Sequence, residues 1–200
     1  MGVAREWLLH VEPEVNPFVF AGRVLVFLLI LGFGLFYIAT PLETMWRAAS
    51  LWHGIDLAIH EAGHLIFAPF GDFMRVLGGS LLQSLVPLLF AAEFLRRKNP
   101  FGAAFGLWWF AQSLLDTAVY MNDARAGVLP LLGGVTGRQA PGYHDFANLF
   151  GRLGWLEYDQ ALARGVQVLA IALMIGSIVW AGGLLGLQWR RVDRSLFGKQ

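Results

Sequence analysis

Ile59-His60-Glu61-Ala62-Gly63-His64-Leu65 places three ionisable side chains inside an apolar segment. Such side chains are costly in a membrane span unless they are paired or coordinated. On a helix, His60 and His64 share one face and can offer imidazole nitrogens to a single metal ion. Glu61 can act as a base on metal-activated water without being a ligand. The segment therefore predicts a metal-binding helix, with a polar packing cluster or haem ligation as the alternatives.

The composition places this helix in a membrane protein. The chain has 200 residues, of which 56% are hydrophobic and 14% are charged, against about 25% charged in soluble domains. A net charge of +1 without a basic stripe argues against nucleic acid as a partner. The absence of cysteine excludes disulfides and thiolate zinc sites, so His, Asp or Glu must hold any metal. We therefore expect an all-α, polytopic membrane helix bundle.

Five apolar stretches are long enough to predict membrane spans within a single domain. The predicted spans cover about 18–39, 50–70, 76–95, 101–121 and 161–187. The third contains Pro87 and is either a kinked span or a re-entrant segment. Residues 1–17 predict an interfacial segment or a frayed tail, with no cleavable signal peptide. Residues 122–160 predict an extramembrane loop that contains a short helix over 146–156.

Basic residues set the expected orientation, because cytoplasmic flanks collect Lys and Arg. The turn Arg96-Arg97-Lys98 and the C-terminal tail that begins with Arg190 and Arg191 are expected to face the cytoplasm. Five spans then place the N-terminus and the 122–160 loop outside. The expected location is a plasma membrane of the bacterial inner-membrane type.

The polar face of the motif helix extends beyond the two histidines. At about 100° per residue, His53 and Asp56 lie within about 40° of His60, and Glu61 lies at the edge of this face. Asp56 could accept a ring N–H from His60 and fix its tautomer. The alternative is that Asp56 and His53 only form hydrogen bonds within the bundle.

A third ligand is needed, because a catalytic zinc ordinarily takes three protein side chains. At about 1.5 Å per residue, His64 and Asp116 lie near the same depth in their spans, which favours Asp116. Gln112 and Tyr120 share its face and could hydrogen-bond a ligand carboxylate or a substrate. The alternative is that Asp116 pairs with Arg23 or with a backbone group.

Three other polar residues could also complete the site. Asp123 ends the fourth span and is expected near Arg125. Asp145 follows a Gly- and Pro-rich stretch and precedes a helical pattern, so it is predicted to be an N-cap. His144 is either an ordinary loop histidine or a lid that adds a further ligand or a transition-state donor.

These residues resemble the site-2 protease family of intramembrane zinc metalloproteases. The resemblance is carried by His60-Glu61-Ala62-Gly63-His64 in one span and Leu114-Leu115-Asp116 in a later span. It implies zinc on His60, His64 and Asp116, with Glu61 as the general base. The chain departs from the family at Thr117, where the family has glycine. It also lacks the Asn-Pro-rich stretch and the PDZ domain, and its motif helix is expected to run in the opposite direction.

The sequence thus predicts an intramembrane zinc metalloprotease that uses Zn²⁺ on His60, His64 and Asp116, with His144 as a further candidate ligand and Glu61 as the catalytic base. The expected partners are the lipid bilayer and a membrane-protein or peptide substrate, and a homo-oligomer is left open. The alternative is a non-proteolytic metal-binding membrane protein or an auxiliary subunit of a membrane complex.

Overall fold

The computed structural model describes residues 3–47 and 51–193. The predicted all-α fold is confirmed, and the described residues form eight α-helices and two short 3₁₀ helices. They are α1 Val3–Leu8, α2 Pro17–Ala39, α3 Leu42–Met45, α4 Leu51–Phe67, η1 Ala68–Phe70, α5 Asp72–Arg96, α6 Pro100–Asn122, α7 Asp145–Leu153, η2 Leu156–Tyr158 and α8 Asp159–Trp189. The predictions for Ser50 and for the tail 194–200 lie outside the described residues.

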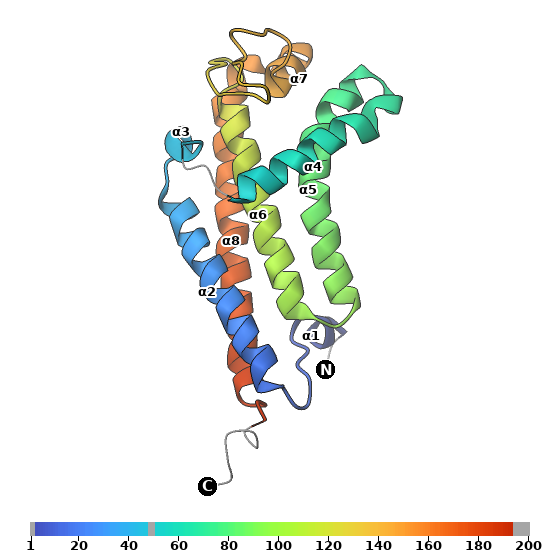
Figure 1. Cartoon of the computed structure of the whole chain (residues 1–200), viewed down its shortest axis with the longest axis vertical. Coiled ribbons are helices and arrows are strands. Elements are labelled where there is room, and N and C mark those ends of the chain that lie inside the picture. The colour runs from blue at the N-terminus through green and yellow to red at the C-terminus, as the bar shows by residue number, and fades with distance from the viewer. Residues whose placement is uncertain (1–2, 48–50, 194–200) are drawn as a thin grey trace.

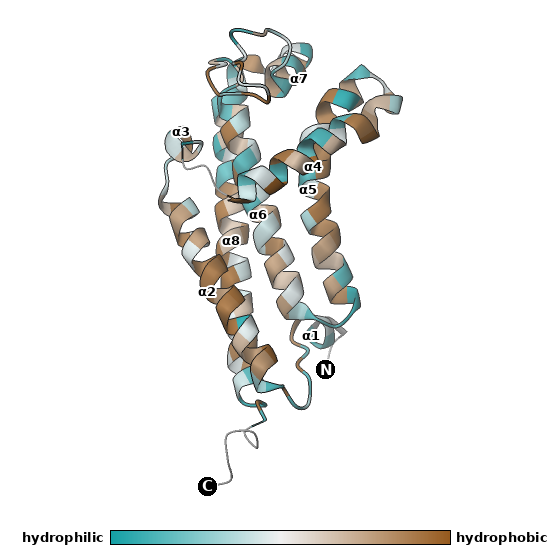
Figure 2. Cartoon of the chain, viewed as in Figure 1, coloured by the Kyte–Doolittle hydropathy of each residue, from teal (hydrophilic) through white to brown (hydrophobic). Residues whose placement is uncertain are grey.

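Among the described residues, three stretches are long and apolar enough to cross a membrane: α2, α5 and Leu156–Trp189. The apolar character of α2 is visible along most of its length in Figure 2. The predicted third span lies within α5, which is one continuous helix that contains Pro87. The predicted spans over 50–70 and 101–121 correspond to α4 and α6, which are outside this group of three.

The centre of the bundle is α6, which lies between α5 and α8 (Figure 1). The helix starts where the Asn99 side chain accepts the Gly102 N–H at 3.0 Å. Pro100 follows at the first helical position, where a missing N–H removes no helical hydrogen bond. Trp108 and Leu115 of α6 are fully buried, and they belong to one apolar core with residues of α2 and α8. This helix is therefore surrounded by protein along much of its length.

Helix α4 begins beside the middle of α6 and not at its end. The Trp52 ring lies 5.1 Å from Trp108 and 6.0 Å from Phe105 between centroids. From there α4 runs obliquely toward the end of the bundle that carries α7 (Figure 1). The predicted second span is thus a 17-residue helix that follows only part of the length of α6.

The segment before α2 lies at the same end of the bundle as the end of α8. The Val15 N–H donates to the Arg191 carbonyl at 2.9 Å, and the Asp193 N–H donates to the Val15 carbonyl at 3.0 Å. Lys98 of the basic turn donates to Glu6 at 3.0 Å. The prediction that the N-terminal segment and the C-terminal end face opposite sides differs from this arrangement, in which both lie at one end of the bundle. It assumed that α4 crosses the whole bundle.

The opposite end carries the 123–144 loop, α7 and η2 (Figure 1). The predicted short helix is present as α7, and it ends at Gly154, whose φ of 70° is a left-handed conformation that glycine adopts readily. Apolar side chains of α7 pack on the end of α6, and Arg152 pairs with Asp72 of α5. This end of the molecule therefore joins α5, α6 and α7.

Glycines let α4 and α5 approach closely at the histidine motif. Gly63 packs against the backbone of Gly78, so neither position has room for a side chain. A Cβ atom on Gly79 would lie 2.6 Å from His60 Nε2 and 2.7 Å from His64 Cε1. The two imidazoles therefore lie directly over the backbone of α5.

Candidate metal centre

His60 and His64 lie on consecutive turns of α4 and form the centre of the site. Their ring centroids are 4.7 Å apart, and the rings are nearly perpendicular, at 84°. His60 is buried, with 6% of its surface exposed, and His64 is partly buried. The helix thus brings the two imidazoles together, as a spacing of four residues requires.

Asp145, the first residue of α7, completes a group of three. Its Oδ2 lies 2.8 Å from His60 Nε2 and 3.3 Å from His64 Nε2. One ligand atom from each of the three side chains lies within 4.8 Å of the other two. Within the described residues, this is the group of His, Asp and Glu side chains that could hold a metal ion.

The other nitrogen of each imidazole faces an acceptor. His64 Nδ1 lies 2.8 Å from the Arg75 carbonyl oxygen, and His60 Nδ1 lies 3.0 Å from Gln83 Oε1. Because these oxygens only accept hydrogen bonds, both Nδ1 atoms carry the hydrogen. The Nε2 of each ring faces the Asp145 carboxylate, where it either holds a hydrogen and donates it to the carboxylate or offers a lone pair to a metal ion.

Two imidazole lone pairs directed at one carboxylate repel it unless a proton or a metal ion lies between them. Two histidines and one carboxylate also form a donor set that catalytic zinc sites use. The fixed Nδ1–H groups match the usual arrangement of metal-bound histidines, in which the second nitrogen donates to a protein acceptor. The residues present therefore fit a divalent cation.

The surroundings of the Asp145 carboxyl favour its deprotonated, anionic form. Burial by itself raises the pKa of this carboxyl, but its hydrogen bonds with His60 and His64 outweigh burial. Its pKa therefore lies below the ordinary value. A deprotonated carboxylate is the form that binds a metal.

Glu61 lines the same cavity as the three candidate ligands. The cavity has a volume of about 1070 Å³ and lies between α4, α5, α6 and the 129–133 part of the loop. Its walls include His53, Asp116 and Tyr120 as well as apolar side chains. A carboxylate next in sequence to His60 thus has access to space in which a substrate could bind.

Asp116, predicted to be the third ligand, is not part of the group of three. Its Oδ1 lies 2.7 Å from His53 Nδ1, and its Oδ2 accepts from Gln83 Nε2 at 3.1 Å. The predicted equal depth of His64 and Asp116 assumed that α4 is parallel to α6, whereas α4 runs obliquely to α6 (Figure 1). The alternative partner Arg23 instead pairs with Glu12 at 2.8 Å.

Asp56 forms a hydrogen bond within the helix bundle and does not contact the candidate ligands. It is fully buried, and its Oδ1 accepts the Trp109 indole N–H at 3.0 Å. The proposed bond from His60 to Asp56 is therefore absent from the contacts of these two described residues. Of the two interpretations of Asp56 and His53, hydrogen bonding within the bundle matches the structure.

His144 is the N-cap of α7 and holds Asp145 in place. Its Nδ1 accepts the Ala147 N–H at 3.3 Å, and its Nε2 lies 3.4 Å from Asp123 Oδ2. It is therefore not directed at the candidate ligands, and the N-cap prediction for Asp145 is off by one residue. Asp123 does not pair with Arg125, whose guanidinium lies 2.8 Å from Asp159.

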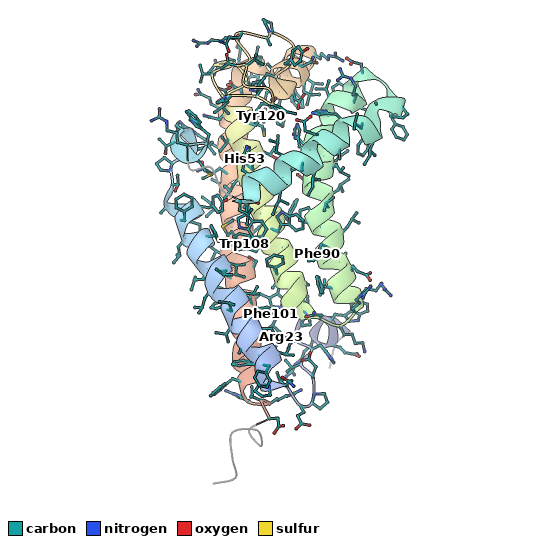
Figure 3. The ribbon with its side chains drawn as sticks, viewed as in Figure 1. Arg23, His53, Phe90, Phe101, Trp108 and Tyr120 are labelled. Carbon is teal, nitrogen blue, oxygen red and sulfur yellow. The ribbon has the colours of Figure 1, made fainter. Side chains whose placement is uncertain are left out.

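Tyr120 of α6 supports the third candidate ligand. Its hydroxyl oxygen accepts the Asp145 backbone N–H at 2.9 Å, and its ring lies 4.2 Å from the His144 ring. Figure 3 shows Tyr120 just beneath α7, with His53 lower on the bundle at the start of α4. The backbone of Asp145 is thus held by α6 while its side chain faces α4.

Comparisons with protein-family models, curated proteins and solved structures found no match. A function must therefore be inferred from the geometry of the site and from the sequence pattern.

The sequence did not favour Asp145 as the third candidate ligand, and it did not indicate Gln83 and the Arg75 carbonyl as partners of the histidines. Asp145 was among the candidates, but its place at a helix start favoured a capping role. A signal was present in the adjacent His144, which can cap the helix in its place. Nothing local to Gln83 in the sequence indicates its contact with His60.

Proposed function

We propose that this chain is a membrane-embedded, zinc-dependent peptidase. His60, His64 and Asp145 hold the metal, and Glu61 is the general base. The observation that carries this proposal is the convergence of three ligand atoms within 4.8 Å, beside a glutamate that lines the same cavity. The resemblance of the histidine motif to site-2 proteases supports peptide bonds as the substrate.

Each side chain has a distinct task in this proposal. Zinc on two histidines and a carboxylate supplies Lewis-acid chemistry, which polarises a carbonyl and activates water. Glu61 takes a proton from the water that adds to the carbonyl carbon of the peptide bond. When the C–N bond breaks, the same carboxyl gives that proton to the leaving amine nitrogen. The reaction consumes one water and forms one carboxylic acid and one amine.

The cavity suits a short extended peptide segment more than an intact helix. Its volume of about 1070 Å³ is at the upper end of ordinary ligand pockets. A helix hides its peptide bonds, so a membrane segment must unwind locally before it can enter. We expect substrates with helix-breaking residues near the cleaved bond.

Glu61→Gln is the test of this mechanism. Purified protein in detergent is loaded with zinc and incubated with casein and with model single-span peptides, and products are identified by mass spectrometry. The wild type is expected to cleave. Glu61→Gln is expected to bind zinc as the wild type does but to lose at least about 100-fold in rate, as general-base removal does. Glu14→Gln, an exposed carboxylate outside the cavity, is the matched control.

Two results would contradict the proposal at different points. Full cleavage by zinc-loaded Glu61→Gln removes Glu61 from the mechanism. Stoichiometric zinc on a wild-type protein that cleaves none of these probes favours the non-proteolytic metal-binding alternative.

A further inference from the structure

Gln83 of α5 connects the histidine motif of α4 to Asp116 of α6. It is buried, with 3% of its surface exposed. Its Oε1 lies 3.0 Å from His60 Nδ1, and its Nε2 donates to Asp116 Oδ2 at 3.1 Å. One amide therefore contacts a candidate metal ligand at one end and a carboxylate at the other.

The chemistry of these groups fixes the direction of the amide. A carboxylate only accepts hydrogen bonds, so the NH₂ group of Gln83 must face Asp116. The carbonyl oxygen must then face His60, and His60 Nδ1 must carry the hydrogen. His60 Nε2 is then the ring nitrogen left to bind a metal ion beside Asp145. Asp116 thus determines the tautomer of His60 without touching it.

The backbone of Gln83 is held by α6 as well. Pro87 has no N–H, so it cannot donate to the Gln83 carbonyl four residues earlier in α5. The Ser113 hydroxyl donates to this carbonyl at 3.1 Å instead. Ser113 and Asp116 lie one turn apart on α6, so one helix holds both the main chain and the side chain of Gln83.

We propose that Gln83 is a positioning residue for the metal ligand His60, and that Asp116 orients Gln83 for this role. The proposal rests on the zinc site proposed above. An acceptor on Nδ1–H fixes the ring and makes Nε2 a better ligand, and loss of such a partner typically weakens metal binding by about 10–100-fold. Asp116 therefore contributes to the metal site although it is not a ligand.

The first test measures the zinc dissociation constant of the purified full chain by competition with a chelator. Gln83→Leu keeps the approximate size of the side chain but removes the acceptor. It is expected to weaken zinc binding by about 10–100-fold. Gln188→Leu removes an equally buried glutamine of α8, and it is expected to leave the dissociation constant unchanged.

The second test exchanges the polarity of the pair. Gln83→Glu places two carboxylates face to face and is expected to weaken zinc binding. Adding Asp116→Asn restores a donor between them, because the new amide at position 116 can donate to the new carboxylate at position 83, which also accepts from His60. The double variant is therefore expected to bind zinc at least about tenfold more tightly than Gln83→Glu alone.

The outcomes separate this inference from the proposed function. If the wild type binds zinc and Gln83→Leu binds it equally well, Gln83 does not position His60. Additive effects of Gln83→Glu and Asp116→Asn would contradict the role of Asp116. If the wild type binds no zinc, the proposed function fails and this inference fails with it. Should Gln83→Leu not fold, the exchange of polarity still decides the question.

Discussion

The choice between Asp145 and Asp116 as the third ligand depends on a single capping interaction. His144 takes the capping position of α7, so the side chain of Asp145 is free to face His60 and His64. Asp116 is already engaged by His53 and Gln83. Both carboxylates line the cavity, but only the Asp145 carboxylate meets the Nε2 atoms of the histidines.

Exchanging each carboxylate for an amide distinguishes these two roles. Asp145→Asn removes the proposed anionic ligand and is expected to weaken zinc binding by more than about 100-fold, beyond the range of residues that only support a ligand. The amide introduced by Asp116→Asn can still accept from Gln83 through its oxygen, so this change is expected to cost less than about tenfold. Chelator competition on the purified variants gives both values. The reverse order would restore Asp116 as the ligand.

The site could be predicted from the sequence only where its residues are local. The pair His60 and His64 follows from helical spacing, and Glu61 follows from its place beside a ligand. Asp145 could not be selected, because 85 residues separate it from His60 and no local pattern encodes that contact. The Gln83 amide was missed for the same reason.

At the level of helices, α2, α5 and α8 were predictable because long apolar runs determine them directly. Helix α4 was harder, since its 17 residues are apolar enough to suggest a full span. Its start against the middle of α6 depends on contacts of Trp52 with α6, which the sequence of α4 does not reveal. Pro87 left open whether α5 is a continuous span or a re-entrant segment. The helix is continuous, and the Ser113 hydroxyl supplies the hydrogen bond to the Gln83 carbonyl that the proline cannot make.

The substitution Ser113→Ala tests how α5 tolerates its proline. It leaves the buried Gln83 carbonyl without a partner and is expected to lower the free energy of unfolding by about 1–3 kcal/mol. In a Pro87→Ala background, the backbone N–H gained at position 87 can donate to this carbonyl, so the same change is expected to cost clearly less. Chemical denaturation in detergent measures the four free energies.

Ser177→Ala is the control for this cycle. Ser177 donates to the Met174 carbonyl within its own helix α8, at 2.7 Å, and such a bond within the helix adds little to helix stability, so Ser177→Ala is expected to cost less than Ser113→Ala. Equal costs of Ser113→Ala in both backgrounds would show that Pro87 does not create the need for Ser113.

For the whole molecule, the contacts of Val15 and of Lys98 bring the N-terminal segment, the basic turn and the end of α8 together. The candidate metal centre lies toward the other end, beside α7 (Figure 1). Because basic flanks face the cytoplasm, we expect the N-terminal segment to be cytoplasmic and α7 to lie on the opposite side. The basic turn alone could indicate this orientation. The sequence did not reveal whether the number of membrane crossings is odd or even, and this number decides whether the two ends of the chain lie on the same side.

The cysteine-free chain allows this orientation to be measured with single cysteines. Glu14→Cys and Arg190→Cys lie at the basic end, and Glu157→Cys lies beside α7, and all three positions are exposed. A membrane-impermeant maleimide applied to intact cells is expected to label Glu157→Cys and to spare the other two. Labelling of Glu14→Cys together with sparing of Arg190→Cys would place the two termini on opposite sides and contradict the arrangement.

The position of Asp145 on α7 would also make a metal ion bound at this site a reversible cross-link between α4 and α7. An ion shared by α4 and α7 closes a chain segment of 85 residues between His60 and Asp145. Chelation is then expected to loosen α7 and to speed trypsin cleavage after Arg138, which is exposed in the adjoining loop. Asp145→Asn is expected to be cut equally fast with and without chelator. Proteases would then reach the 123–144 loop only when the metal is absent, so the supply of the ion would also determine how long the protein persists.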